Sequence, residues 1–211
     1  MRTFVGFRRR GGGRKAEYMR IILASQSPRR RELLKGLIDE FEIVPALCGE
    51  NAQGSPVRVT IQQGYDKALD VFLRNPDALV IGADSVVTID GLILGKPADE
   101  ADARRMLGLL SGRVHSVITG MCVVSPRGCV VRADETRVEF RSLAPAEIDA
   151  YIATKEPMDK AGAYGIQGLG GALVRGYEGD YDNVVGLCVS SLAQILTRDF
   201  GLALANRHAG R

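Results

Sequence analysis

The chain has 211 residues, of which 45% are hydrophobic and 25% are charged, a composition typical of a soluble globular protein with one large domain or two small ones. No stretch is apolar for long enough to span a membrane. Two histidines and four cysteines without a C-x-x-C pair argue against a zinc site, and scattered thiols of this kind predict a cytoplasmic protein.

The net charge of +3 is unevenly distributed along the chain. Residues 1–18 contain six basic residues and one acidic residue, a net charge of +5, so the rest of the chain has a net charge of −2. Residues 1–18 also contain three consecutive glycines and no apolar periodicity, which predicts a disordered basic leader before one domain over 19–211. The weak charge of that domain argues against a nucleic-acid partner.

Apolar periodicity and turn residues predict strands that alternate with helices, with hairpins among them. In the first half of the chain we expect a strand over 20–24, a helix over 28–37, a strand over 41–45, a helix over 57–73 and strands over 78–89 and 92–94. In the second half we expect a helix over 99–110, strands over 114–124 and 130–140, a helix over 145–153, a strand over 172–177 and a helix over 189–200. This order predicts an α/β fold with a mixed sheet.

The start of the first helix combines hydroxyls with several arginines. Ser27 is the expected N-cap and Pro28 the first helical residue, so the arginines at 29–31 fall in the first turn. Cations there are unfavourable unless an anion is bound, and free amides, hydroxyls and guanidinium groups together favour a phosphate site. The alternative is a solvated basic turn on an ordinary helix.

Asp84 interrupts a strongly apolar strand. A carboxylate in such a place must be paired, or must reach a cleft or a metal ion. The alternative is a carboxylate at a strand end that accepts a hydrogen bond from a neighbouring amide.

Two further stretches carry candidate ligand-binding groups. Lys96 follows a predicted hairpin, where its ammonium could reach a phosphate, although alone it would be an exposed loop lysine. Gln167 lies among glycines too dense for a helix, and its amide could pair with the O4 and N3–H edge of uracil or thymine. A mobile loop with a solvated glutamine is the alternative.

Two other polar positions have structural interpretations. His115 at a strand start is expected to be structural, since no Ser/His/Asp or Cys/His set accompanies it. Asp182 or Asn183 could cap a short helix, and Asp180 is expected to lie in a structural turn.

Six stretches occur in an order that resembles the Maf family of nucleoside triphosphate pyrophosphatases: LASQSPRRRELL, IGADSVV, GLILGKP, LSGRVHSV, EPMDKAGAYGIQG and GDYDNVVGL. The resemblance runs from about residue 20 to residue 200. It implies an elongated α/β mixed-sheet fold with a deep central cleft, similar to inosine triphosphatase. It also implies hydrolysis of a nucleoside triphosphate to the monophosphate and pyrophosphate with a divalent cation (Mg²⁺, Mn²⁺ or Co²⁺), often by a homodimer.

Within the family, AGAYGIQG resembles the branch that acts on dTTP and UTP. The resemblance makes Asp84 the general base or a metal-bound carboxylate, and Glu50 a metal ligand. It assigns phosphate binding to Ser25, Arg29, Arg30, Lys67 and Lys96, and base selection to Arg29, Ser85 and Gln167.

The chain departs from the family pattern at three positions. Gly49 precedes Glu50 where the family has a second carboxylate, Ser85 replaces a threonine, and Cys188 replaces a proline. Two other functions stay open: a non-catalytic regulator of cell division that binds a nucleotide or a partner, and an enzyme that removes modified pyrimidine nucleotides.

Overall fold

The computed structural model describes residues 5–6, 18–49 and 51–204. Glu50 and most of the predicted leader lie outside the described residues. At the two ends of the leader, β1 (Val5–Gly6) pairs antiparallel with β2 (Tyr18–Met19), which extends one residue beyond it, and the disorder expected over 1–18 stays a prediction.

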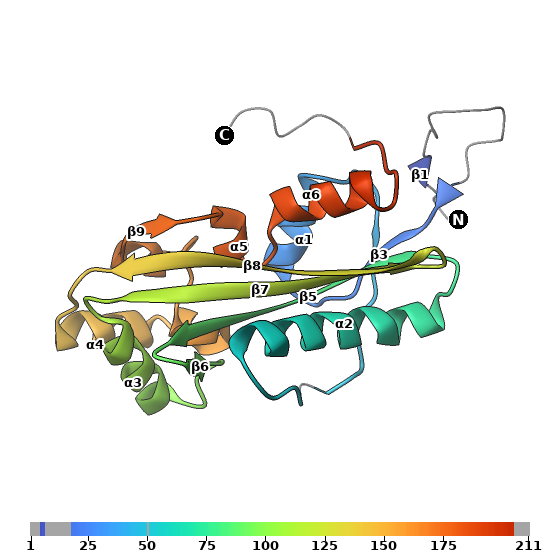
Figure 1. Ribbon diagram of the computed structural model, residues 1–211. Helices are drawn as coiled ribbons and strands as arrows, with labels where there is room; N and C mark the ends of the chain where they lie inside the picture. The colour runs from blue at the N-terminus through green and yellow to red at the C-terminus, as the bar shows by residue number, and fades with distance from the viewer. Residues whose placement is uncertain (1–4, 7–17, 50, 205–211) are drawn as a thin grey trace.

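The remaining elements follow the predicted order (Figure 1). The strands are β3 (Ile21–Leu23), β4 (Glu42–Ile43), β5 (Leu79–Ile89), β6 (Leu92–Leu94), β7 (Val114–Ser125), β8 (Gly128–Phe140) and β9 (Val174–Glu178). The helices are α1 (Pro28–Lys35), α2 (Pro56–Arg74), α3 (Glu100–Leu110), α4 (Pro145–Ala153), α5 (Tyr181–Val185) and α6 (Val189–Arg198). Three 3-10 helices, η1 (Glu156–Asp159), η2 (Ala161–Ala163) and η3 (Leu169–Leu173), lie between α4 and β9.

One mixed sheet organises the molecule, as predicted. Its strand order is β4-β3-β5-β7-β8-β9, and β6 pairs with β5. β3 runs parallel to both β4 and β5, because a helix connects each successive pair of these strands. The other pairings are antiparallel. Asp90 and Gly91 both have positive φ, as the tight β5–β6 hairpin turn requires.

The sheet is covered on both faces (Figure 1). Side chains of the central strands alternate between an apolar cluster with α1 and α6 and a second cluster with α2. Ile81 and Met121 belong to the first cluster, whereas Val80 and Cys122 belong to the second. A third cluster joins α3 and α4 to the far end of the long strands.

Glycines bring α2 unusually close to the sheet. A Cβ on Gly82 would lie 2.3 Å from the carbonyl oxygen of Gly64, and one on Gly120 would lie 2.2 Å from the carbonyl carbon of Thr60. Real Cβ atoms do not approach this closely, so these positions require glycine. The close approach fixes how the side chains of α2 meet those of β5.

Part of one β5 edge is left open by the neighbouring strands. β3 pairs with β5 over Leu79–Ile81, and β6 pairs with it over Val87–Ile89. Between them, residues 82–86 pair with β7 on one side, and none of the described strands covers the other side. This gap lies at the carboxyl end of a parallel strand pair, where α/β sheets commonly bind ligands.

Two sequence-based details are corrected. The cap of α5 is Asp180, whose carboxylate accepts a hydrogen bond from Asn183 N–H, rather than Asp182 or Asn183. The helix begins two residues earlier than a cap at Asp182 would place it, and its cap directly follows Gly179, which adopts a positive φ. The first helix ends at Lys35 rather than at residue 37.

Candidate nucleotide-binding pocket

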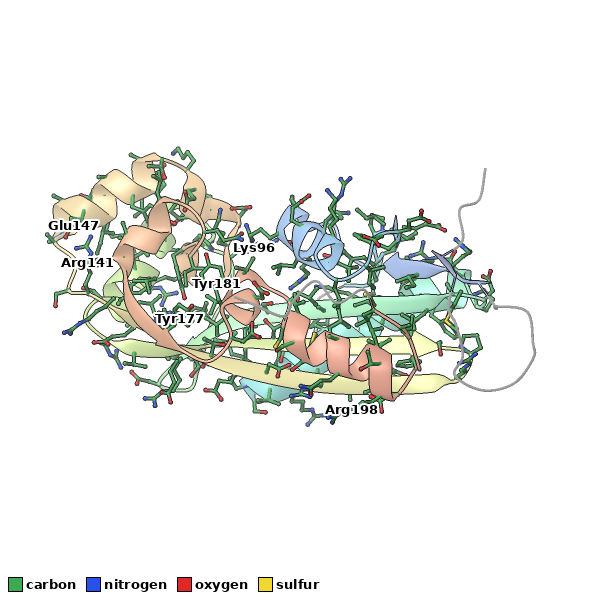
Figure 2. The ribbon with its side chains drawn as sticks, turned by 90° about the horizontal axis from the view of Figure 1, so that it is seen from above. Lys96, Arg141, Glu147, Tyr177, Tyr181 and Arg198 are labelled. Atoms are coloured by element: carbon green, nitrogen blue, oxygen red, sulfur yellow. The ribbon has the colours of Figure 1, made fainter. Side chains whose placement is uncertain are left out.

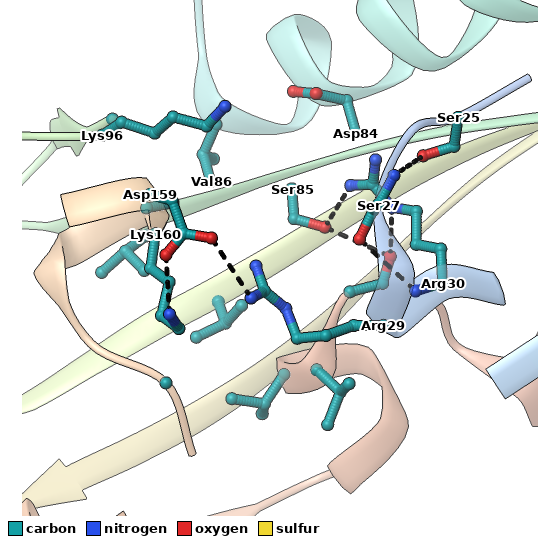
Figure 3. Close-up of a pocket in the computed structure, with 18 of the residues that line it drawn as sticks. Ser25, Ser27, Arg29, Arg30, Asp84, Ser85, Val86, Lys96, Asp159 and Lys160 are labelled. Atoms are coloured by element: carbon teal, nitrogen blue, oxygen red, sulfur yellow. Dashed lines mark hydrogen bonds and ion pairs between the residues drawn. The ribbon is translucent and has the colours of Figure 1, made fainter. Parts of the chain in front are cut away.

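A pocket of about 960 Å³ opens at the uncovered β5 edge. The start of α1, the middle of β5, the loop after β6, the segment 156–168 and the end of α5 line it (Figure 3). It brings together eight of the predicted site residues: Ser25, Arg29, Arg30, Lys67, Asp84, Ser85, Lys96 and Gln167. Glu50 lies outside the described residues. The family resemblance also implies that the cleft is deep, and this stays a prediction.

The α1 wall begins with the predicted cap. Ser27 Oγ accepts a hydrogen bond from Arg30 N–H at 3.4 Å, and Pro28 is the first helical residue. The buried Ser25 Oγ accepts from Ser27 N–H at 3.1 Å, which shapes the turn between β3 and α1. Arg31 is exposed and does not line the pocket. A helix start with basic side chains therefore faces the cavity.

Arg30 is held by two elements distant in sequence. Its Nε donates to the carbonyl oxygen of Gly186 at 2.8 Å, and its Nη2 donates to Ser85 Oγ at 3.1 Å. Ser85 Oγ in turn lies 2.8 Å from Thr119 Oγ1. The observed contacts of Ser85 orient Arg30. The base-selecting role expected of Ser85 stays a prediction.

A buried polar network supports this contact from behind. Thr119 Oγ1 also lies 3.0 Å from the carbonyl oxygen of Asn183, whose Nδ2 donates to the carbonyl of Val117 and to Thr136 Oγ1. Asn183, Thr119 and Thr136 are fully buried. These buried hydrogen bonds hold Thr119 and Ser85 in place, because removing a partner costs about 1–3 kcal/mol, although Asn183 Oδ1 has no partner among the described residues.

Asp84 forms an ion pair at the base of the pocket. Gly82 faces α2, so strand alternation turns Asp84 to the same face. Lys67 follows Gly64 by one helical turn, and its Nζ lies 2.7 Å from Asp84 Oδ1. The side chains are 13% and 16% exposed. Asp84 Oδ2 has no partner among the residues that the structure describes.

The opposite wall is the segment 156–168. Arg29 Nη1 reaches across the pocket to Asp159 Oδ2 at 3.9 Å, whereas Arg30 points to Ser85 (Figure 3). Asp159 also accepts from Lys160 Nζ at 2.7 Å, and this hydrogen bond holds the pKa of Asp159 below its ordinary value. Sequence reasoning assigned no role to Asp159 or Lys160. Their place directly before the glycines was the signal that could have identified them.

Lys96 and Gln167 are exposed residues of the same pocket. Lys96 lies between the α4 end of the molecule and α1 (Figure 2). Gly162 N–H donates to the carbonyl of Gly95 at 3.0 Å, which joins the Lys96 loop to the glycine-rich segment. The Lys96 loop and the glycine-rich segment therefore form one rim of the pocket.

A divalent cation fits the oxygen chemistry of Asp84. One carboxylate oxygen faces Lys67 and the other is open, and Mg²⁺ typically binds through one or two carboxylates and substrate phosphates. Oriented to satisfy both groups, Gln63 Oε1 accepts from Asn51 N–H and Ala52 N–H at 2.9 Å each, next to Glu50 in sequence. The described ranges contain no cluster of three or more His, Cys, Asp or Glu side chains that could hold a metal by itself.

Fold and site together define a class of protein: a mixed-sheet α/β protein with a cation-rich pocket at the end of its parallel strands. A family model described as Maf-like protein matches residues 20–199. The chain belongs to the Maf family, as the sequence motifs predicted.

Individual proteins agree with this assignment. A protein named dTTP/UTP pyrophosphatase from Thermococcus gammatolerans is 46% identical over 187 residues, which cover 89% of this chain and 100% of the relative. One of the same name from Gloeobacter violaceus is 47% identical over 180 residues, 84% of this chain and 95% of the relative. The crystal structure of protein VC0702 from Vibrio cholerae matches with a TM-score of 0.31 and 18% identity, over 65% of this chain and 68% of that one.

Proposed function

We propose that the chain hydrolyses dTTP and UTP to the monophosphate and pyrophosphate. The observation that carries the proposal is the pocket itself, in which the open carboxylate oxygen of Asp84 faces a cavity lined by Lys67, Arg30 and Lys96. Relatives named dTTP/UTP pyrophosphatase, 46–47% identical over most of the chain, support the same activity over a regulator without catalysis.

We assign the triphosphate to the side of the pocket formed by α1, α2 and β5. Arg30, Lys67 and Lys96 supply positive charge there, and Ser25 lies at the turn before the α1 amides. Charge-assisted contacts with phosphate oxygens are about twice as strong as neutral hydrogen bonds. Such contacts would bind the substrate and neutralise charge that develops on the leaving pyrophosphate.

We assign the base to the side formed by the segment 156–168. Gln167 offers an amide oxygen and an amide N–H, which together complement the N3–H and O4 edge shared by thymine and uracil. Arg29 reaches toward this side through Asp159 and away from the charges around Asp84. We therefore place Arg29 at the base rather than at the phosphates. Ser85 would act on the base only indirectly, through the orientation of Arg30.

The chemical step needs an attacking water and a stabilised leaving group. Water attacks the α-phosphorus, the bond from that phosphorus to the bridging oxygen breaks, and pyrophosphate leaves with that oxygen. Asp84 accepts the proton of the water, while Lys67 orients the carboxylate. A divalent cation held by Asp84 and Glu50 would neutralise phosphate charge when bound.

Three accompanying properties stay predictions: a homodimer, a cytoplasmic location and the absence of a nucleic-acid partner. None of the helices in the described part of the chain has the length and apolarity to cross a membrane. Modified pyrimidine nucleotides fit the same pocket chemistry and belong in the substrate panel.

The test is pyrophosphate release from dTTP, UTP, CTP, GTP and a modified pyrimidine triphosphate, with Mg²⁺, Mn²⁺ or Co²⁺. Release from dTTP and UTP, with Asp84→Asn reducing kcat about 10²–10⁴-fold, supports the proposal. Nucleotide binding without pyrophosphate release would instead favour the regulator. Wild-type rates in the Asp84→Asn variant would remove Asp84 from its assigned role.

A further inference from the structure

A carboxylate beneath the glycine-rich segment makes three hydrogen bonds. Glu156 Oε2 accepts from Leu169 N–H at 2.9 Å, and Oε1 accepts from Gly170 N–H at 3.1 Å and from Tyr151 O–H at 2.9 Å. Burial alone would raise the pKa of Glu156, but the N–H groups of Gly170 and Leu169, the Tyr151 hydroxyl and the charge of Lys160 together leave that pKa below its ordinary value. The side chain is thus an ionised acceptor with both oxygens engaged.

Tyr151 extends the contact to the other end of the segment. The buried Tyr151 hydroxyl donates to Glu156 and accepts from Gly165 N–H at 3.2 Å. Glu156 and Tyr151 together therefore bind three backbone amides on both sides of Gln167. We call these two side chains the Glu156–Tyr151 pair.

The glycines make this arrangement possible. A Cβ on Gly168 would lie 2.5 Å from Glu156 Oε1, and a Cβ on Gly170 would lie 2.5 Å from Tyr151 Oη. Any larger residue would separate the backbone from these acceptors. Without the acceptors, a segment so rich in glycine would lose more conformational entropy on ordering than other sequences do.

Gln167 lies at the exposed tip between the bound amides. No hydrogen bond of its own side chain to the described residues is observed, so its place at the pocket depends on the backbone that carries it. Glu156 also lines the pocket, but both of its carboxylate oxygens accept hydrogen bonds from internal donors, so we infer that it acts on the pocket through the segment.

We propose that Glu156 is a positioning residue for base selection, which with Tyr151 holds residues 165–170 so that Gln167 meets the pyrimidine edge. This inference rests on the proposed function. Glu156 is not expected to touch the substrate. Its loss should therefore impair discrimination between bases while the chemical step at Asp84 continues.

The first test measures the segment without any substrate. In Glu156→Gln, an amide N–H₂ replaces one acceptor oxygen and must face a donor, so at least one backbone amide loses its partner. Hydrogen exchange at Leu169 and Gly170 should accelerate about tenfold or more, which corresponds to about 1.4 kcal/mol. Unchanged exchange would overturn the proposal, whatever the enzyme does.

The second test measures selectivity. Glu156→Gln should raise KM for dTTP and UTP about tenfold, change kcat less than threefold, and reduce the preference for dTTP over CTP. Tyr151→Phe should act in the same direction and serves if Glu156→Gln does not fold. Glu178→Gln is the matched control, because Glu178 is 82% exposed on β9 and does not line the pocket.

A double-mutant cycle connects Glu156 to Gln167. In a Gln167→Ala background, Glu156→Gln should have little further effect on the dTTP/CTP ratio, because both changes remove the same contact. Additive effects, or an equal loss for all bases, would show that Glu156 has only a general structural role. A wild-type protein that releases no pyrophosphate would defeat the proposed function, while the exchange experiment would still decide the positioning role.

Discussion

The two walls of the pocket are built on different physical grounds. The α1 wall consists of a helix start and a strand, and Arg30 is fixed there by Gly186, Ser85 and a buried polar network. The segment 156–168 opposite has no long helix or strand, and its course depends on side chains that bind backbone amides. The comparison indicates that regular structure fixes the proposed phosphate side, whereas a few side chains fix the proposed base side.

The largest expected effect is the loss of stability when the packing of α2 against the sheet, beneath both walls, is disturbed. Gly120→Ala places a Cβ 2.2 Å from the carbonyl carbon of Thr60 and forces α2 away from β7. The free energy of unfolding should fall by about 3 kcal/mol. Gly176→Ala on β9 is the control, since a Cβ there meets nothing within 4 Å. Urea denaturation compares the two, and equal stability of both variants would show that the close approach of α2 is unnecessary.

Two neighbouring arginines on α1 allow the effect of a fixed side-chain position on substrate binding to be distinguished from the effect of net charge. Arg30→Ala should lower kcat/KM for dTTP about 10–100-fold, because a guanidinium fixed at the pocket contributes about 1.5–3 kcal/mol through charged hydrogen bonds. The exposed Arg31 has the same charge one residue away, and Arg31→Ala should change kcat/KM less than about twofold. Similar losses in both variants would mean that net charge, and not the fixed position, determines binding.

The segment wall should also give the protein a pH-dependent stability. His115 Nε2 lies 2.8 Å from Tyr164 Oη, and burial lowers the pKa of His115 to about 4 from 6.5. As the pH falls below 6.5, His115 binds a proton in the unfolded chain but stays neutral in the folded protein, so the free energy of unfolding decreases toward pH 4. Between about pH 7 and pH 5, His115 should lower the free energy of unfolding by about 2 kcal/mol.

Urea denaturation of wild type and His115→Gln at several pH values isolates this contribution. Carboxylates contribute to both proteins alike, so the difference between the two slopes belongs to His115. Parallel slopes would mean that the pKa of His115 is the same in the folded and the unfolded protein.

The smallest expected effect concerns the base. Gln167→Ala should reduce the preference for dTTP and UTP over CTP about tenfold, or about 1.4 kcal/mol, because an amide that complements one edge rejects a base that leaves it unpaired. Pyrophosphate release at low substrate concentration measures this ratio. Equal changes for all bases would assign base selection to another residue and remove the functional contrast between the two walls.

Local sequence determined most of the elements and one half of the site. Ser27 and Pro28 begin α1, Asp90 and Gly91 form the β5–β6 turn, and the apolar run over 79–89 forms the central strand, because each depends on capping, backbone conformation or periodicity within a few residues. The same local rules located Arg30, Asp84 and Gln167 as unusual polar positions. Family motifs, rather than periodicity, predicted that they belong to one pocket.

Tertiary structure decided the pairings. That Asp84 meets Lys67, that Ser85 orients Arg30 and that Arg29 turns to Asp159 depends on strands and helices distant in sequence. The sequence assigned no role to Glu156, because two of its three partners are backbone amides, which every sequence possesses. Single residues thus revealed the chemistry available, but only the approach of α2 through Gly82 and Gly120, and the gap at the β5 edge, decided where that chemistry converges.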